Sequence, residues 1–580
     1  MKHRGLHAKY LFFLDFYPLE GYNLDMNITF YGAARMVTGS CTLLECNNVN
    51  ILIDCGLPQG SDEKTLGMEF PFNPISIDHI LLTHAHIDHS GRIPMMIRQG
   101  FRGTIHTTHA TVDLCSIMLS DSGHIQEMEA QWVNRKRIRD GKPPIEPIYT
   151  VEDAVKSMDY FIGHEYEHTF NVASGIVATF SDAGHILGSS SIKFELTEGG
   201  KKRNIVFSGD IGNLDQPIIN DPVLLNDADF VVMESTYGDR EHPPVAHPSQ
   251  KVSTQERAAS LAIYIEQTFK RGGNVIIPSF AVGRTQEILY LIRHIINHKM
   301  IKGIDTFPVF LDSPLAIRAT EVFGKNIEGY FDEEAMAIVN KGDNPLRFPS
   351  LIMSVTSDDS KAINALKESA VIISASGMCE AGRIKHHLKH NLYRKESTIV
   401  FCGYQAKGTL GRSILDGAKK VKIFNEQIEV RAEIVKLEGI SGHADQKGLI
   451  KWISHFTSPL RHVFVVHGDE SVARFFAGYL HSHLNVPSWA PKVGQTFNLL
   501  SDEFPKAEKE SIWVTSLEQL TTSISELEES IQSTANIIKR MKEHSEVVIK
   551  EEDSKASSRL SGAMDRLLSE INELNNRWGG

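Results

Sequence analysis

Several features that define common protein classes are missing from this chain of 580 residues. The six cysteines show no CxxC spacing, which indicates reduced, mostly buried thiols rather than a disulfide framework. The most apolar early stretch, residues 10–17, contains Asp15 and is far shorter than the roughly 20 residues that a bilayer crossing needs. It also lacks the cleavage pattern of a signal peptide. We therefore expect no membrane association, and the cytoplasm is the default location.

The chain also has fewer positively charged than negatively charged residues. The chain has 60 Lys+Arg against 72 Asp+Glu, and a net charge of −12 slows the encounter with a polyanion such as nucleic acid. Residues 501–580 hold 10 Lys+Arg and 16 Asp+Glu, so 10 − 16 = −6, half of the excess, lies in this tail. The rest of the chain can therefore still form a local basic groove.

The remaining composition, 41% apolar and 23% charged residues, is typical of a soluble globular protein with two or three domains. Short apolar runs alternate with helix-length segments such as 108–139, which favours a layered α/β fold. The pattern restarts between about 240 and 430, and strand-like runs followed by histidines return after it. A chain that leaves one pattern and re-enters it suggests an inserted domain. The early apolar runs are 28–32, 51–56, 80–83, 205–209 and 230–233.

The two ends of the chain differ from its middle. Leucine and isoleucine recur with heptad spacing over 517–541 and again over 560–578, on either side of the charged stretch 550–553. The tail 505–580 can form a homodimer, bind a protein partner or pack on its own domain. Residues 1–25 have no clear period and form an arm of uncertain order.

Four metal-binding side chains fall within six residues, directly after the apolar run 80–82. They are His84, His86, Asp88 and His89. A strand that runs into a tight loop turns alternate side chains to one side, so His84 and His86 can share one ion while Asp88 and His89 reach a second. Thiolates are absent from this cluster, which disfavours a purely structural zinc site. The alternative is a polar loop with several histidines, but such a loop gives no reason for four metal-binding side chains within six residues.

Candidates for the remaining ligands follow other apolar strands. His185 follows the run 175–180, where Gly184 permits a tight turn. Asp210 follows 205–209, and its carboxylate has the two oxygens needed to bridge two cations. His467 follows 463–466. Each alone can be an ordinary turn residue, because Asp and Gly are common in turns, but their recurrence after strands favours a shared site.

Taken together, these segments resemble the metallo-β-lactamase superfamily, and the inserted unit resembles that of the β-CASP nucleases, in the bacterial RNA-processing and cleavage-and-polyadenylation-factor-like branch. The resemblance covers about residues 26–490. It implies a four-layer αββα metallo-β-lactamase fold with an inserted α/β β-CASP domain. The heptad pattern adds a helical, coiled-coil-like tail that lies outside the family's core pattern. The segments that carry it are 51–56, 83–89, 183–185, 208–210, 234–238, 441–445 and 466–468, with 278–287, 311–316, 374–378 and 403–405 in the insert.

The resemblance also implies domain boundaries and a ligand set. Residues 26–239 and 431–500 would form the metallo-β-lactamase domain and 240–430 the β-CASP domain, whereas the arm 1–25 and the tail 501–580 lie outside the family's pattern. Two Zn²⁺ ions per chain are implied, with Asp210 as their bridge. Asp54 would orient water or a histidine from outside the ligand set. The first ion would be held by His84, His86, His185 and Asp210, and the second by Asp88, His89, Asp210 and His467.

The activity implied is hydrolysis of RNA phosphodiesters by a hydroxide that the two zinc ions activate. His443 would be the general acid, with Glu234 as its hydrogen-bonding partner. A histidine with an unperturbed pKa of about 6.5 suits that role, and a nearby carboxylate raises its protonated fraction. In this family a histidine at the position of His467 accompanies RNA-acting members. Arg284 could hold a neighbouring phosphate through a bidentate fork.

The Ser376-Gly377 turn could present backbone N–H groups to a phosphate of single-stranded RNA. Endonucleolytic cleavage is the first choice, because the chain resembles the compact branch more than ribonuclease J. A 5′-to-3′ exoribonuclease, a DNA-acting β-CASP nuclease and a small-molecule hydrolase of the same superfamily are the alternatives. A scaffold that has lost activity would be expected to have lost ligands, and this chain retains them.

Overall fold

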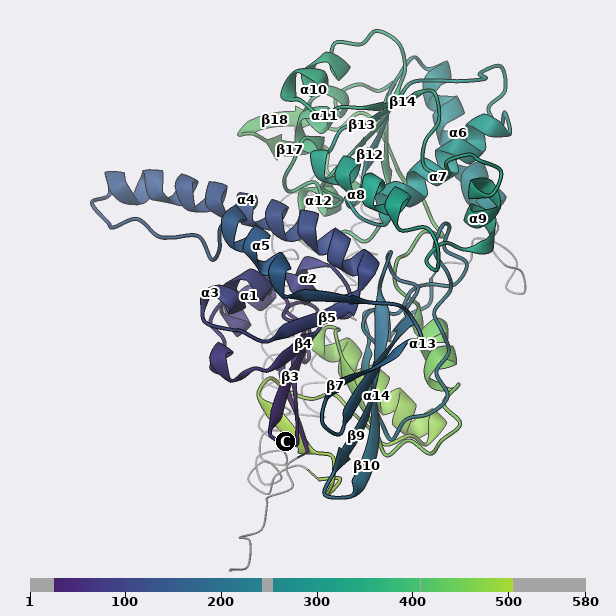
Figure 1. The fold of residues 1–580 in the computed structure, drawn as a ribbon. Coiled ribbons are helices and arrows are strands. Elements are labelled where there is room, and N and C mark those ends of the chain that lie inside the picture. Colours follow the sequence, from purple (N-terminus) through teal and green to yellow (C-terminus); the bar gives the residue numbers. More distant parts are fainter. Residues whose placement is uncertain (1–25, 243–253, 407, 504–580) are drawn as a thin grey trace, which may run out of the picture. The chain divides into compact units, whose positions relative to one another are not determined.

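The structure, a computed structural model, describes residues 26–242, 254–406 and 408–503. Two seven-stranded sheets and one six-stranded sheet form its framework (Figure 1). The first sheet has the order β22-β1-β2-β3-β4-β5-β6. Its strands are β1 (Asn27–Gly32), β2 (Cys41–Cys46), β3 (Val49–Ile53), β4 (His79–Leu81), β5 (Thr104–Thr108), β6 (Phe161–His164) and β22 (Gln495–Asn498).

The second sheet has the order β21-β20-β11-β10-β9-β8-β7. Because β9 is antiparallel to both β8 and β10, and β10, β11 and β20 are parallel, four of its strands end at the same edge. That edge carries functional side chains. The strands are β7 (Thr169–Ala173), β8 (Ile176–Asp182), β9 (Ser190–Glu198), β10 (Lys201–Phe207), β11 (Phe230–Glu234), β20 (His462–Val466) and β21 (Ser488–Trp489).

The two seven-stranded sheets pack face to face. The ring of Phe30 in β1 lies 5.2 Å from that of Phe464 in β20, and the ring of Phe230 in β11 lies 6.0 Å from that of Phe497 in β22. Both contacts join the first sheet to the second. β11 and β20 are apolar along nearly their whole length, and the side chains on one face of each fill the space between the sheets.

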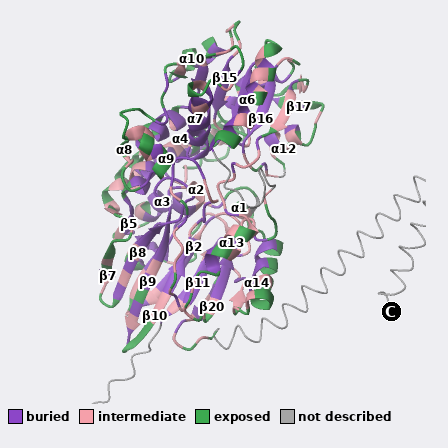
Figure 2. Cartoon of the chain, turned by 90° about the vertical axis from the view of Figure 1, so that its right-hand side faces the viewer, coloured by how far each residue is buried: buried purple, intermediate pink, exposed green. Residues whose placement is uncertain are grey.

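Helices cover the outer face of each sheet, so that the buried residues form continuous layers (Figure 2). Leu114 of α4 shares a core with Leu52 of β3. Trp452 of α13 and Phe476 of α14 share another with Val465 of β20. The order helix, sheet, sheet, helix confirms the predicted four-layer fold. The helices are α1 (Ser61–Leu66), α2 (Ile87–Ser90), α3 (Ile93–Arg98), α4 (His109–Arg139), α5 (Val151–Ser157), α13 (Gln446–Ile453) and α14 (Glu470–Leu484).

The inserted domain is built on the six-stranded sheet, whose order is β14-β13-β15-β12-β16-β19 and whose strands are all parallel. The strands are β12 (Val275–Pro278), β13 (Val309–Leu311), β14 (Leu351–Met353), β15 (Val371–Ser374), β16 (Thr398–Phe401) and β19 (Glu433–Lys436). The inserted domain is predicted to end at residue 430. β19 lies after that residue but pairs with β16 of the inserted sheet, so this sheet extends beyond the predicted boundary. A hairpin of β17 (Lys420–Ile423) and β18 (Glu426–Glu429) precedes β19.

Helices lie on both faces of this parallel sheet. Leu289 of α7 packs with Ile277 of β12 on one face, whereas Leu388 of α11 packs with Ile276 of β12 on the other. Because both faces are covered, the strands are apolar throughout rather than alternating. The helices are α6 (Thr254–Lys270), α7 (Arg284–Asn297), α8 (Pro314–Lys325), α9 (Glu333–Val339), α10 (Ser357–Ile363), α11 (Ile384–Asn391) and α12 (Leu410–Leu415).

The two domains share an apolar core, to which Leu114 of α4 and Phe323 of α8 both belong, and polar contacts join them as well. Asn326 beside α8 donates to the carboxylate of Asp113 in α4 at 2.9 Å. Arg257 of α6 donates from Nε to Gly439 O at 2.9 Å, and from Nη1 to Asp215 O. Arg257 therefore joins the inserted domain to two loops of the first domain.

The predicted arm 1–25 and all but the first few residues of the predicted tail lie outside the described residues. None of the helices in the described part of the chain has the length and apolar character to cross a membrane.

Candidate active site

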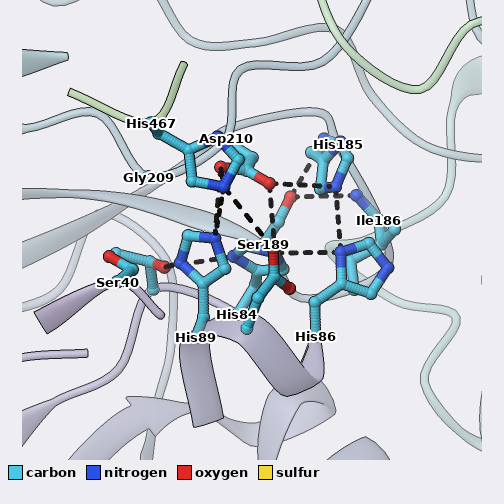
Figure 3. A network of polar contacts seen from close by, with 12 residues as sticks. Ser40, His84, His86, His89, His185, Ile186, Ser189, Gly209, Asp210 and His467 are labelled. Atoms are coloured by element: carbon cyan, nitrogen blue, oxygen red, sulfur yellow. Dashed lines mark hydrogen bonds and ion pairs between the residues drawn. The ribbon is translucent and has the colours of Figure 1, made fainter. Parts of the chain in front are cut away.

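Side chains from several strand ends converge at the edge shared by the two seven-stranded sheets (Figure 3). Asp54 directly follows β3, and His84 lies shortly after β4. His185, Asp210 and His467 follow β8, β10 and β20. Within the sequence cluster, His86 precedes α2 and the next two candidates, Asp88 and His89, belong to it. The convergence follows from strand direction, because strands that run the same way deliver their last residues to one edge.

Two of these loops depend on a left-handed backbone. His467 has φ = 50° and Asp54 has φ = 63°, which few non-glycine residues adopt. Gly56 lies against α2, since a Cβ at this position would fall 1.6 Å from the carbonyl oxygen of Asp88. Strained backbone that neighbouring contacts hold in place is typical of functional sites.

The first group of candidate ligands is His84, His86, His185 and Asp210, whose ligand atoms all lie within 4.8 Å of one another. The Nε2 atoms of His84 and His185 are each 3.5 Å from Asp210 Oδ2. The Nδ1 atom of His86 is 3.0 Å from His84 Nε2 and 3.2 Å from His185 Nε2. Four donor atoms therefore face one small volume.

The second group is Asp88, His89 and His467. His467 Nε2 lies 3.2 Å from His89 Nε2 and 3.6 Å from Asp88 Oδ2. The Oδ1 atom of Asp210 is 3.3 Å from His89 Nε2 and 3.6 Å from His467 Nε2. Asp210 thus turns one oxygen to each group, as a bridging carboxylate does.

The chemistry of these donor atoms fits metal cations. His185 Nδ1 lies 2.9 Å from the Gly442 carbonyl, which only accepts, so it carries the proton and the neutral ring has its lone pair at Nε2. That lone pair faces the oxygen of Asp210. In addition, Asp210 Oδ1 is buried and accepts no hydrogen bond from the described residues. Acceptors that face acceptors in a buried site are stable only around a cation.

The charge states agree with this arrangement. Burial lowers the pKa of both His84 and His185 well below 6.5, so both rings are neutral near pH 7. Burial by itself would raise the pKa of Asp210, but the imidazoles of His467 and His89 lower it well below 3.8. Burial lowers the pKa of His89 and His467, but the facing carboxylates outweigh it and raise the pKa of both rings. Zinc would replace a proton on each of these two rings, because an ionised carboxylate and neutral imidazoles are the forms that bind zinc.

Asp54 lies behind the ligands. Its carboxylate accepts hydrogen bonds from Thr83 N at 2.8 Å and from Ser40 Oγ at 3.0 Å, and its Oδ2 atom is 2.7 Å from His89 Nδ1. The contact with His89 orients that ring so that Nε2 points toward Asp210. Asp54 therefore lies where the sequence predicts a residue that orients a histidine.

Glu234 and His443 form a third group with Asp210. Glu234 Oε1 accepts from Ile211 N at 2.6 Å and is 3.3 Å from His443 Nδ1, which is itself 4.0 Å from Asp210 Oδ2. Burial lowers the pKa of His443, but the Glu234 carboxylate outweighs it and raises that pKa to about 9. The His443 side chain is 23% exposed against 1% for Glu234, so the imidazole is on the open side of the pair.

Of the predicted phosphate contacts, Arg284 lies beside the ligand set, because a Cβ at Gly442 would lie 3.7 Å from His185 Nδ1 and 3.6 Å from Arg284 Nη2. Arg284, at the start of α7, is 9% exposed and forms an ion pair with Glu287. Ser376 and Gly377 follow β15 at the carboxyl edge of the inserted sheet. Contact of these three residues with RNA remains a prediction.

Several residues that support the site are not among those selected from the sequence. Thr236 Oγ1 lies 3.0 Å from His467 Nδ1, and Gln216 Nε2 donates to the Gly442 carbonyl at 3.2 Å. Arg257 holds Gly439, four residues before His443. Only Thr236 has a usable signal, since it lies in the segment 234–238 that carries the family resemblance.

Comparison with known families accounts for most of the described chain. Residues 35–257 match the family model described as metallo-β-lactamase superfamily. Residues 285–414 match the β-CASP domain, and residues 427–491 match the Zn-dependent metallo-hydrolase RNA specificity domain. These matches indicate a metal-dependent enzyme, in agreement with the clustered His and Asp side chains.

Curated relatives match over most of their length. The chain is 36% identical over 445 residues to a protein named ribonuclease TTHA0252 from Thermus thermophilus, covering 77% of this chain and 94% of that protein. It is 30% identical to an RNase J-like protein of Methanocaldococcus jannaschii, covering 80% and 98%. It is 29% identical to the transcription termination factor FttA of the same organism, covering 80% and 70%.

Proposed function

The chain belongs to the β-CASP family of the metallo-β-lactamase superfamily, and from this premise we propose that it is a hydrolase that cuts single-stranded RNA at internal phosphodiester bonds, using two zinc ions. The observation that carries the proposal is the position of Asp210, which faces both groups of metal ligands and the Glu234–His443 pair. Relatives named as ribonucleases, together with the match to an RNA specificity domain, support RNA as the substrate.

Each of the two ligand groups would hold one zinc ion. His84, His86 and His185 would hold one zinc ion, Asp88, His89 and His467 the other, and Asp210 both. When bound, such ions supply a hydroxide at neutral pH and neutralise charge on the phosphoryl oxygens. The protein keeps the ligands in place through Asp54 on His89 and the Gly442 carbonyl on His185.

His443 is the group that would give a proton to the leaving alkoxide. Glu234 holds its Nδ1 side, which leaves Nε2 for the substrate. Because the Gly442 carbonyl accepts from His185, the loop that carries His443 is tied to the ligand set. The distance from acid to phosphate is thereby coupled to the metal centre. A positioned general acid contributes about 10²- to 10⁴-fold to a rate.

Cleavage within the strand is supported by the side-chain contacts that follow β15. An enzyme that starts from a 5′ end needs a charged pocket for the terminal phosphate. Arg383, the described arginine that follows the Ser376-Gly377 turn, is already bonded to the Asp312 carboxylate and to the Ser354 carbonyl. This arginine is therefore not available to a terminal phosphate, while the backbone of the turn can still contact an internal one.

The test is cleavage of one RNA strand labelled at its 5′ end or its 3′ end, beside the DNA strand of the same sequence. We expect internal products from both labels, little cutting of DNA, and loss of cutting in Asp210→Ala. Release of mononucleotides from the 5′ end would instead show a 5′-to-3′ exoribonuclease. Preference for the DNA strand would show a DNA-acting nuclease.

The role of His443 is tested with two leaving groups. We expect His443→Ala to lower RNA cleavage by about 10²-fold or more. The same variant should hydrolyse bis(p-nitrophenyl) phosphate nearly as fast as the unmodified protein, because p-nitrophenolate leaves without a proton. Glu234→Gln, which keeps the shape of the side chain, should show the same selectivity with a smaller loss. Equal losses on both substrates would reject general-acid catalysis by His443.

A further inference from the structure

The connections of the inserted sheet change direction between β12 and β15. These two strands are neighbours, yet the chain leaves β12 through α7 on one face and leaves β15 through α11 on the other. Their carboxyl ends are therefore a topological switch point, the place where ligands bind in open parallel sheets. The two loops touch there, because Phe280 N lies 3.2 Å from the position that a Cβ would take at Gly377.

Three loops meet at this switch point and carry two exposed aromatic rings. Phe280, after β12, is 42% exposed, and Tyr404, after β16, is 48% exposed. The buried side chain of Gln405 donates to the Gly377 carbonyl at 3.0 Å and so ties the loop of Tyr404 to the loop after β15. Apolar rings are usually covered, and exposed aromatics are typical of recognition sites.

The ring of Phe280 rests on glycine backbone. Its Cδ2 and Cε2 atoms lie 3.0 Å from the position that a Cβ would take at Gly377, and Cε2 lies 3.8 Å from the equivalent position at Gly403. The Phe280 carbonyl accepts from Thr285 N at 3.3 Å and from Thr285 Oγ1 at 2.6 Å. The residue is thus fixed on one side, while much of its ring remains open to solvent.

The same loop reaches the metal centre. Gly283, three residues after Phe280, lies against Ile186, because a Cβ at 283 would fall 3.1 Å from Ile186 Cγ2. Ile186 is the neighbour of His185, a candidate metal ligand. Three extended residues span about 10 Å at most. A ring at this distance can meet a nucleotide next to the one whose phosphate is cut.

We propose that Phe280 is a stacking platform for an unpaired base of the RNA strand, with Tyr404 as a second wall of the same subsite. This inference rests on the proposed function, since it assumes that the metal centre cuts RNA. A base suits this position because polar and glycine backbone surrounds the ring. An apolar protein surface that docked here would bury little apolar area. Stacking on an aromatic ring accepts every base, because each base has a π-face.

The first experiment measures the affinity of the full-length, metal-stripped protein for a fluorescent single-stranded RNA by anisotropy. We expect Phe280→Ala to bind about ten-fold more weakly, and Phe280→Trp to bind as the unmodified protein does. The matched control is Tyr393→Ala, an aromatic residue 52% exposed that precedes β16 and so lies at the opposite end of that strand. Unchanged affinity in Phe280→Ala would overturn the proposal.

The second experiment separates stacking from a structural effect. Abasic nucleotides are placed in the RNA one position at a time. At one position the unmodified protein should lose about ten-fold in affinity, and Phe280→Ala should lose nothing further there. Equal losses in both proteins at every position would also overturn the proposal. Labelled-RNA cleavage tests the proposed function separately, since a protein that binds this RNA but never cuts it fails only that proposal.

Discussion

Replacing Arg257 by methionine removes the charged contact between α6 and the loop that carries His443. The arginine is 3% exposed and donates from Nε to Gly439 O at 2.9 Å and from Nη1 to Asp215 O. Methionine fills a similar volume but donates nothing, so two carbonyls lose a charged donor. Because both carbonyls are half-buried, each costs the low end of the roughly 1–3 kcal/mol for a group left without its partner, and we expect a loss of about 2 kcal/mol in the free energy of unfolding. Glu287 keeps its ion pair with Arg284, so no carboxylate is left without a partner.

The larger expected effect of Arg257→Met is on catalysis. A catalytic group displaced by about 1 Å costs on the order of 10²-fold in rate, and Gly439 lies only four residues before His443. We therefore expect kcat for RNA to fall by about that factor with little change in KM. Hydrolysis of bis(p-nitrophenyl) phosphate and zinc content should stay near those of the unmodified protein, because neither needs the proton of His443.

Steady-state kinetics on both substrates, thermal unfolding and zinc analysis are the assays. The matched control is Arg461→Met. That arginine is 42% exposed and bonded to Asp229 and Asp502, and exposed ion pairs contribute about 0–1 kcal/mol. An unchanged rate on RNA, or an equal fall on both substrates, would refute the role of Arg257 in positioning the acid.

Three further outcomes are expected. Asp210→Asn should lower zinc content by atomic absorption and remove RNA cleavage, and full zinc retention would contradict its position between the two ligand groups. Burial and the imidazole of His164 lower the pKa of His106 to about 3. The stability that neutral His106 contributes is complete above its unfolded pKa of about 6.5 and is lost as pH falls from there toward 3. His106→Gln should therefore flatten the acid side of a melting-temperature profile, and an unchanged acid side would reject this. Gly56→Ala should unfold at a clearly lower temperature, because its Cβ would meet the Asp88 carbonyl oxygen at 1.6 Å, and an unchanged melting temperature would contradict that contact.

Local pattern in the sequence was enough for a layered α/β fold with an inserted domain and for part of the candidate site, whereas the four-layer arrangement followed from the family resemblance. The helix expected over 108–139 is α4, and the apolar runs at 80–83, 205–209 and 463–466 overlap β4, β10 and β20. The residues after those strands lie together because strand direction and the period of 2 determine where a strand end points. His84, Asp210 and His467 could therefore be selected before any contact was known.

Only the tertiary structure decided the contacts that join distant segments. Arg284 was expected to hold a phosphate, yet its guanidinium forms an ion pair with Glu287, and the contact with RNA stays a prediction. Arg257 and Gly439 are 182 residues apart, and no local pattern relates them. The ring of Phe280 rests on Gly377 because two parallel strands end side by side. Such contacts depend on packing between elements, whereas a sequence pattern reports only which face of its own element a residue occupies.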